Sequence, residues 1–121
     1  MQYDKNNVFY KIINRELNAN IILEGEHFLA FHDIAPKAPV HVLVIPKGCY
    51  VDYYDFVLNA SDTEILDFCR GTAEIIKMMK IEKPGFKLVA NAGKFSMNDE
   101  KGQEVMHFHF HILGKPLDDN D

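Results

Sequence analysis

The sequence has 121 residues, of which 47% are hydrophobic and 26% charged, the balance of one soluble globular domain. Thirteen basic and eighteen acidic side chains give a net charge of −5. This charge argues against non-specific nucleic-acid binding, which requires a positive field. No stretch approaches the roughly 18 apolar residues of a membrane span, and the first residues do not resemble a signal peptide. We therefore expect a cytoplasmic protein that binds neither nucleic acid nor membranes, with Cys49 and Cys69 reduced.

The first half of the chain alternates short apolar segments with turns. Asn7 is a predicted helix cap, and the apolar residues that follow form one stripe of a short helix over 8–15. Segments 20–24 and 27–34 are predicted strands, and the glycine between them indicates a hairpin. Segment 40–46 is rich in β-branched residues and ends at a proline, which predicts a third strand.

The second half begins with a capping box at Ser61 and Glu64, which predicts a helix running to about Lys80. Apolar residues recur in this helix every three or four positions and predict one buried stripe. Its members are Ile65, Leu66, Cys69, Ala73, Ile76 and Met79. Segments 86–91 and 105–113 are the fourth and fifth predicted strands. This order of elements predicts an α+β fold with one antiparallel sheet.

Three histidines alternate with phenylalanines in the fifth predicted strand. His107, His109 and His111 are then expected on one face of the sheet, about 6.6 Å apart from one to the next. Phe108 and Phe110 are expected on the other face. Three interpretations are open: a half-buried strand with a polar face, a metal site, or covalent catalysis on a phosphate. A neutral imidazole suits the third, because one ring nitrogen held as a donor leaves a nucleophilic lone pair on the other.

The pattern His-φ-His-φ-His-φ-φ at 107–113, where φ is apolar, resembles the signature of the histidine-triad (HIT) superfamily. Further segments resemble the Hint branch of this superfamily: 8–13, 29–36, 38–47, 89–91 and 102–105. Leu113-Gly114 favours the Hint branch over the Fhit-like dinucleoside polyphosphate hydrolases, which usually have proline after the leucine. The match covers most of residues 7–116.

The resemblance implies a single HIT domain over 1–121, with a core at 7–116 and tails at 1–6 and 117–121. It implies a five-stranded antiparallel sheet with a short N-terminal helix and one long helix. Relatives of this kind form twofold homodimers, so the sheet is expected to extend across a homodimer.

The resemblance also implies catalytic roles. His109 is expected to attack the α-phosphorus and form a nucleotidyl-histidine intermediate, which water then cleaves. His111 is expected to hold the α-phosphate, and His107 and His41 to orient the nucleophile. Glu104 stands where some relatives have a serine that helps the leaving group.

A nucleotide-binding set follows from the same resemblance. Asp33 matches the acid that binds the ribose, although on its own it would be interpreted as a solvated strand end. The base is expected in an apolar slot, and Asn91 with its neighbours is expected beside the phosphate. The full set is Phe9, Ile12, Phe31, His32, Asp33, Ile34, Asn91, Gly102, Gln103, His109 and His111.

The expected activity is hydrolysis of purine nucleoside 5′-phosphoramidates or aminoacyl-adenylates, without a metal or other cofactor. Asn7 and Tyr10 stand where some relatives carry zinc-binding cysteines, so no structural zinc is expected. The loop from Asn91 to Gly102 is several residues longer than is usual in the Hint branch. Two alternatives are kept: a nucleotide-sensing or partner-binding module with little turnover, and a histidine–metal protein.

Overall fold

The computed structural model describes residues 2–97 and 100–117. Three helices and five strands are present in these ranges. In chain order they are α1 (Val8–Ile13), β1 (Ile21–Glu24), β2 (Phe28–His32), β3 (Val40–Pro46), α2 (Tyr53–Asn59), α3 (Asp62–Met78), β4 (Phe86–Val89) and β5 (Phe110–Gly114). None of the helices in the described ranges is long and apolar enough to cross a membrane.

The five strands form one antiparallel sheet, as the sequence predicts, and their order in the sheet is β1-β2-β3-β5-β4. β5 lies between β3 and the edge strand β4, with Leu43 opposite His111 and His41 opposite Leu113. This central position places the last histidine of the triad in the middle of the sheet.

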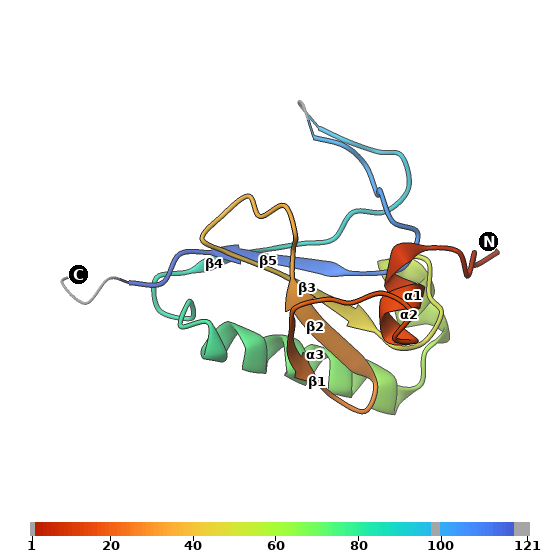
Figure 1. Cartoon of the computed structure of the whole chain (residues 1–121), viewed down its shortest axis with the longest axis horizontal. Coiled ribbons are helices and arrows are strands. Elements are labelled where there is room, and N and C mark those ends of the chain that lie inside the picture. The colour runs from red at the N-terminus through yellow and green to blue at the C-terminus, as the bar shows by residue number, and fades with distance from the viewer. Residues whose placement is uncertain (1, 98–99, 118–121) are drawn as a thin grey trace.

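The sheet separates two apolar clusters because successive side chains of a strand point to opposite faces. On β3, Val42 and Val44 pack in the larger cluster with Phe68 and Ile75 of α3. Leu43 packs on the other face, in a smaller cluster that contains Phe9 and Ile12 of α1. Figure 1 shows α3 along one face of the sheet, while the described part of the segment between β4 and β5 (cyan to blue) projects on the other side.

The buried stripe predicted for α3 is partly wrong. Ile65, Ile76 and Met79 pack against the larger cluster as expected. Leu66, Cys69 and Ala73 are exposed, and their expected places are taken by Phe68, Thr72 and Ile75. Close packing at Gly71 sets this orientation, because a Cβ atom there would lie 2.4 Å from the ring of Phe28.

The structure contains one helix that the sequence pattern does not predict. The fold was expected to contain one short and one long helix, but Tyr53–Asn59 forms the additional short helix α2. Asp52 caps it by accepting a hydrogen bond from the amide of Asp55. Phe56 of α2 is buried in the larger cluster, which anchors the helix to the sheet.

The fifth strand begins later than predicted, at Phe110 rather than residue 105. The amide of Phe108 donates to the carbonyl oxygen of Tyr50 instead of joining the sheet. The expected alternation nevertheless continues: Phe108 packs in the larger cluster, and the rings of His107 and His109 both face Phe9 on the other side.

Both expected tails, 1–6 and 117–121, fall partly outside what the structure describes, since residues 1 and 118–121 are not included. Within the N-terminal segment, Tyr3 contacts the core: its ring lies edge-on to the ring of His107, with centroids 5.5 Å apart.

Candidate functional site

A pocket of about 630 Å³ opens on the sheet face that α3 does not cover. Its walls come from α1, the central strands, the loop after β2 and the segment before β5. Most of the predicted site residues line it: Phe9, Ile12, Phe31, His32, Asp33, Ile34, His41, Asn91, Gly102, Glu104, His109 and His111. Among predicted site residues, His107 and Gln103 are not part of the lining. His107 instead lies fully buried behind His109.

The floor of the pocket is apolar. Phe9 and Ile12 of α1 pack against Phe31 and Leu43 of the sheet in one buried cluster. Ile34 behaves differently from the expected slot residue, because its side chain is 99% exposed and lies at the rim. A flat apolar group such as a purine base is the kind of ligand that this floor suits.

The hydrogen bonds of His107 and His109 determine which ring nitrogens carry protons. A carbonyl oxygen only accepts, so His107 donates from Nε2 to the carbonyl oxygen of Pro46 at 2.8 Å. By the same argument, His109 donates from Nδ1 to the carbonyl oxygen of His107 at 2.7 Å. A neutral His109 therefore keeps its lone pair on Nε2, the atom that a nucleophilic histidine needs.

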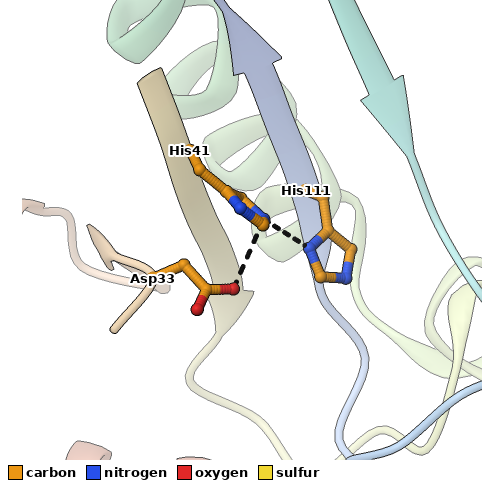
Figure 2. Close-up of side chains that lie close together, drawn as sticks. All are labelled: Asp33, His41 and His111. Carbon is orange, nitrogen blue, oxygen red and sulfur yellow. Dashed lines mark hydrogen bonds and ion pairs between the residues drawn. The ribbon is translucent and has the colours of Figure 1, made fainter. Parts of the chain in front are cut away.

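The hydrogen bonds of His107 and His109 form one hydrogen-bond relay. His41 and His111 form a second relay (Figure 2). The amide of Lys37 donates to Nδ1 of His41 at 3.1 Å, so the proton of neutral His41 lies on Nε2. This Nε2 is 2.9 Å from Nδ1 of His111, which must accept. The proton of neutral His111 is therefore on its own Nε2, where it can be donated to an anionic ligand in the pocket.

Asp33 ends the relay at the rim. One of its carboxylate oxygens accepts from the amide of Ala35 at 2.8 Å, and the other lies 3.3 Å from Nε2 of His41. The carboxylate is only 19% exposed. Each oxygen retains a second lone pair, so ribose hydroxyl groups can still donate to it.

Asp33, His41 and His111 are also the one group in the described residues with metal-binding potential, since one ligand atom of each lies within 4.8 Å of the other two. Binding an ion through Nε2 of His41 would require moving its proton to Nδ1. That nitrogen already faces the N–H of Lys37. The arrangement is therefore satisfied as a chain of hydrogen bonds, and it fits a metal poorly.

Gln103 does not line the pocket, and its hydrogen bonds stabilise the loop that contains Gly93. Its side chain donates to the carbonyl oxygens of Val51 and Val105 and accepts from the amide of Gly93. Its own amide donates to the carbonyl oxygen of Gly93. The predicted binding role of Gln103 is therefore corrected to a structural one. Gly102 keeps the two sides of the loop together, because a Cβ atom there would lie 2.7 Å from the Gly93 oxygen.

Several residues that line the pocket were not predicted from the sequence, and Leu43 and Lys37 are two of them. Leu43 could have been found, because strand alternation places it on the same face as His41. The backbone amide of Lys37 could not, since nothing in its side chain signals the hydrogen bond that fixes the tautomer of His41.

A model of the HIT domain matches residues 14–117 of this chain. The chain belongs to the HIT family. An uncharacterized HIT-like protein of Rickettsia prowazekii is 48% identical over 112 residues, which cover 93% of this chain and 89% of that protein. A solved Hit-like protein is 42% identical, with a TM-score of 0.76 over 90% of this chain and 98% of the other. A solved HIT family hydrolase from Clostridium thermocellum is 35% identical, with a TM-score of 0.75 over 93% of this chain and 92% of the other.

Burial makes four histidines of this HIT protein harder to protonate: His41, His107, His109 and His111. Burial lowers the pKa of His107 to about 4, and burial is also the main cause that lowers the pKa of His111 to about 4. Burial lowers the pKa of His41 and His109 as well. All four are therefore neutral near pH 7, which is the state that both hydrogen-bond relays require.

The protein should lose stability in mild acid. An unfolded histidine takes up a proton below about pH 6.5, whereas folded His107 does so only near pH 4, so falling pH favours the unfolded state. Between pH 6.5 and 5, His107 alone should lower the free energy of unfolding by roughly 1–2 kcal/mol. Urea denaturation at stepped pH measures this.

In a His107→Gln variant, the free energy of unfolding should depend less on pH, because the contribution of His107 is gone. His27→Gln, which alters a histidine outside the pocket, should keep the pH dependence that His107 contributes. A free energy of unfolding that stays constant between pH 6.5 and 5 in the wild type would contradict the neutral, buried histidine.

Proposed function

We propose that this HIT protein is a nucleotide hydrolase that cleaves purine nucleoside 5′-phosphoramidates or aminoacyl-adenylates at the α-phosphate. The observation that carries the proposal is the hydrogen bond from Nδ1 of His109 to the carbonyl oxygen of His107. It leaves the lone pair of Nε2 available on a histidine that lines the pocket. His111, beside it with ring centroids 4.9 Å apart, supplies an N–H donor for a phosphate oxygen.

The pocket supports a mononucleotide as ligand. Its volume of about 630 Å³ falls in the usual range for small-molecule sites. In the proposed complex the base lies on Phe9 and Phe31, and the ribose hydroxyl groups donate to Asp33. The α-phosphate then reaches the histidines, and Asn91 lies at the phosphate side.

The proposed reaction has two displacements. Nε2 of His109 forms a bond to the α-phosphorus while the P–N or P–O bond to the leaving group breaks. Water then attacks the phosphorus and the bond from phosphorus to Nε2 breaks, which releases the nucleoside monophosphate, returns one proton to solvent and regenerates the neutral imidazole. A departing amine must gain a proton, and we propose that solvent water supplies it at the pocket mouth, where Glu104 lies with its side chain 65% exposed and can orient this water by accepting a hydrogen bond from it.

The rate is expected to come from orientation and hydrogen bonding rather than from a metal. Nδ1 of His109 is already hydrogen-bonded, so the positive charge that develops on the imidazole during attack is stabilised by the carbonyl of His107. Activity should therefore persist in excess EDTA.

Replacing His109 by alanine should abolish turnover without abolishing binding. With a fluorogenic adenosine 5′-phosphoramidate in excess EDTA, His109→Ala should lose roughly a thousandfold or more in kcat/KM, about 4 kcal/mol in transition-state free energy. His27→Ala, a histidine outside the pocket, is the matched control and should keep wild-type activity.

If wild type and His109→Ala are equally inert while AMP still binds, the hydrolase proposal is wrong for this substrate class. The nucleotide-sensing alternative would then replace it.

We also propose a twofold homodimer that extends the sheet through β4. β4 is an edge strand, and its residues Phe86 and Leu88 are 45% and 43% exposed. On α3, Leu66 is 52% exposed and shares the outer face of the helix with the exposed Cys69 and Ala73. Unpaired edge strands and contiguous apolar faces are features that pairing with a second copy buries.

Light scattering coupled to size exclusion should report about twice the monomer mass of 13.9 kDa for the wild type. Leu66→Glu should shift the protein towards monomer, because it would bury a charge in the interface. Leu58→Glu, which alters a 64% exposed leucine on α2 rather than on α3 or β4, should remain dimeric. A monomeric wild type at tens of micromolar would overturn the proposal.

A cytoplasmic location is proposed on the state of the cysteines. Cys49 and Cys69 are both free and exposed, which is typical of a reducing compartment.

A further inference from the structure

Tyr3 reaches across the molecule to the first histidine of the triad. Its hydroxyl oxygen lies 2.5 Å from Nδ1 of His107, although the two residues are 104 positions apart in the chain. The rings meet edge-on at 73°, and Tyr3 is also packed edge-on against Tyr10 of α1, with centroids 6.1 Å apart. Tyr3 is therefore joined to the triad at His107, a residue that does not line the pocket.

The direction of this hydrogen bond follows from its neighbours. His107 donates from Nε2 to the carbonyl oxygen of Pro46, so its Nδ1 carries a lone pair and must accept. Burial raises the pKa of Tyr3 to about 12, so the hydroxyl keeps its proton and is the donor. His107 is 0% exposed, and water cannot readily replace Tyr3 as its partner.

His107 also holds the ring of His109 through a hydrogen bond. With both ring nitrogens of His107 occupied, by Tyr3 and by Pro46, its ring has one orientation and one tautomer. The carbonyl oxygen of His107 then accepts from Nδ1 of His109 at 2.7 Å, and Phe9 packs edge-on against both rings. A disturbance of His107 is therefore transmitted to the residue that carries the free Nε2 lone pair.

We propose that Tyr3 is a positioning residue for His109, acting through His107: its hydroxyl fixes the ring of His107, whose carbonyl group holds Nδ1 of His109 as the donor. This inference rests on the proposed function, in which Nε2 of His109 is the nucleophile. Tyr3 touches neither the pocket nor the substrate in this scheme. Its loss should weaken the chemical step while leaving the nucleotide pocket unchanged.

Tyr3→Phe removes only the hydroxyl and is the test variant. With the adenosine 5′-phosphoramidate, kcat should fall about tenfold or more, by analogy with the loss of a hydrogen-bond partner that orients a metal-ligating histidine. KM and the affinity for AMP should stay within twofold of wild type. A merely structural defect would lower the active fraction and thermal stability without changing the kcat of the folded enzyme.

Tyr10→Phe is the matched control. Tyr10 contacts Tyr3 through its ring, and its hydroxyl makes no hydrogen bond within residues 2–97 and 100–117. It should behave as wild type. The ¹⁵N resonances of the histidine side chains supply a second readout: in Tyr3→Phe, Nδ1 of His107 should shift towards the position of a nitrogen with a free lone pair, and the resonances of His109 should shift with it.

The outcomes separate the two proposals. If the wild type hydrolyses the substrate and Tyr3→Phe keeps its kcat within twofold, the role of Tyr3 is overturned and the hydrolase proposal stands. If the wild type is inactive, the hydrolase proposal fails, and the NMR spectra still decide the positioning role. Resonances of His109 that are unchanged in Tyr3→Phe would then overturn it.

Discussion

The hydrogen bond from Nδ1 of His109 to the carbonyl oxygen of His107 is the constraint around which the site is organised. A neutral imidazole has one donor and one acceptor nitrogen, and this bond decides which is which. The bond is possible because residues 107–109 leave the regular sheet and turn a backbone carbonyl towards the following ring. Burial supports it by keeping both histidines neutral at pH 7.

Both faces of the sheet support the histidines: one face fixes their backbone by packing, and the other supplies their hydrogen-bond partners. Phe108 and Ile112 lie in the cluster beneath α3, which fixes the backbone that carries the histidines. Strand β3 contributes twice to the pocket side, through the carbonyl of Pro46 and the side chain of His41. The same alternation that buries apolar residues on one face of the sheet thus presents hydrogen-bonding groups on the other.

Local pattern was enough to predict the five strands, α1, α3 and the shared face of the triad histidines. These features depend on residues close in sequence, such as the alternation of His109 with Phe110 and the capping box at Ser61. The family assignment rested on the same short motifs, and the match of the HIT domain confirms it. The positions of Phe9 and Asp33 beside the triad followed from that resemblance rather than from local pattern.

The errors come from choices that only tertiary contacts decide. α3 carries two apolar stripes, and the one with Phe68 rather than Cys69 faces the sheet because Gly71 admits the ring of Phe28. α2 lacks a clear period, and its burial depends on the single residue Phe56. The contact of Tyr3 with His107 has no signal in the chain, since it joins segments at opposite ends of the sequence.

The central claim is that Nε2 of His109 is the atom that takes the nucleotidyl group. Acid quenching during turnover of an adenosine 5′-phosphoramidate, followed by digestion and peptide mass spectrometry, tests it directly. The account predicts an added adenylyl group on the peptide that contains 107–111, with fragmentation assigning it to His109. An adduct on another histidine, or no adduct at any time during steady turnover, would contradict it.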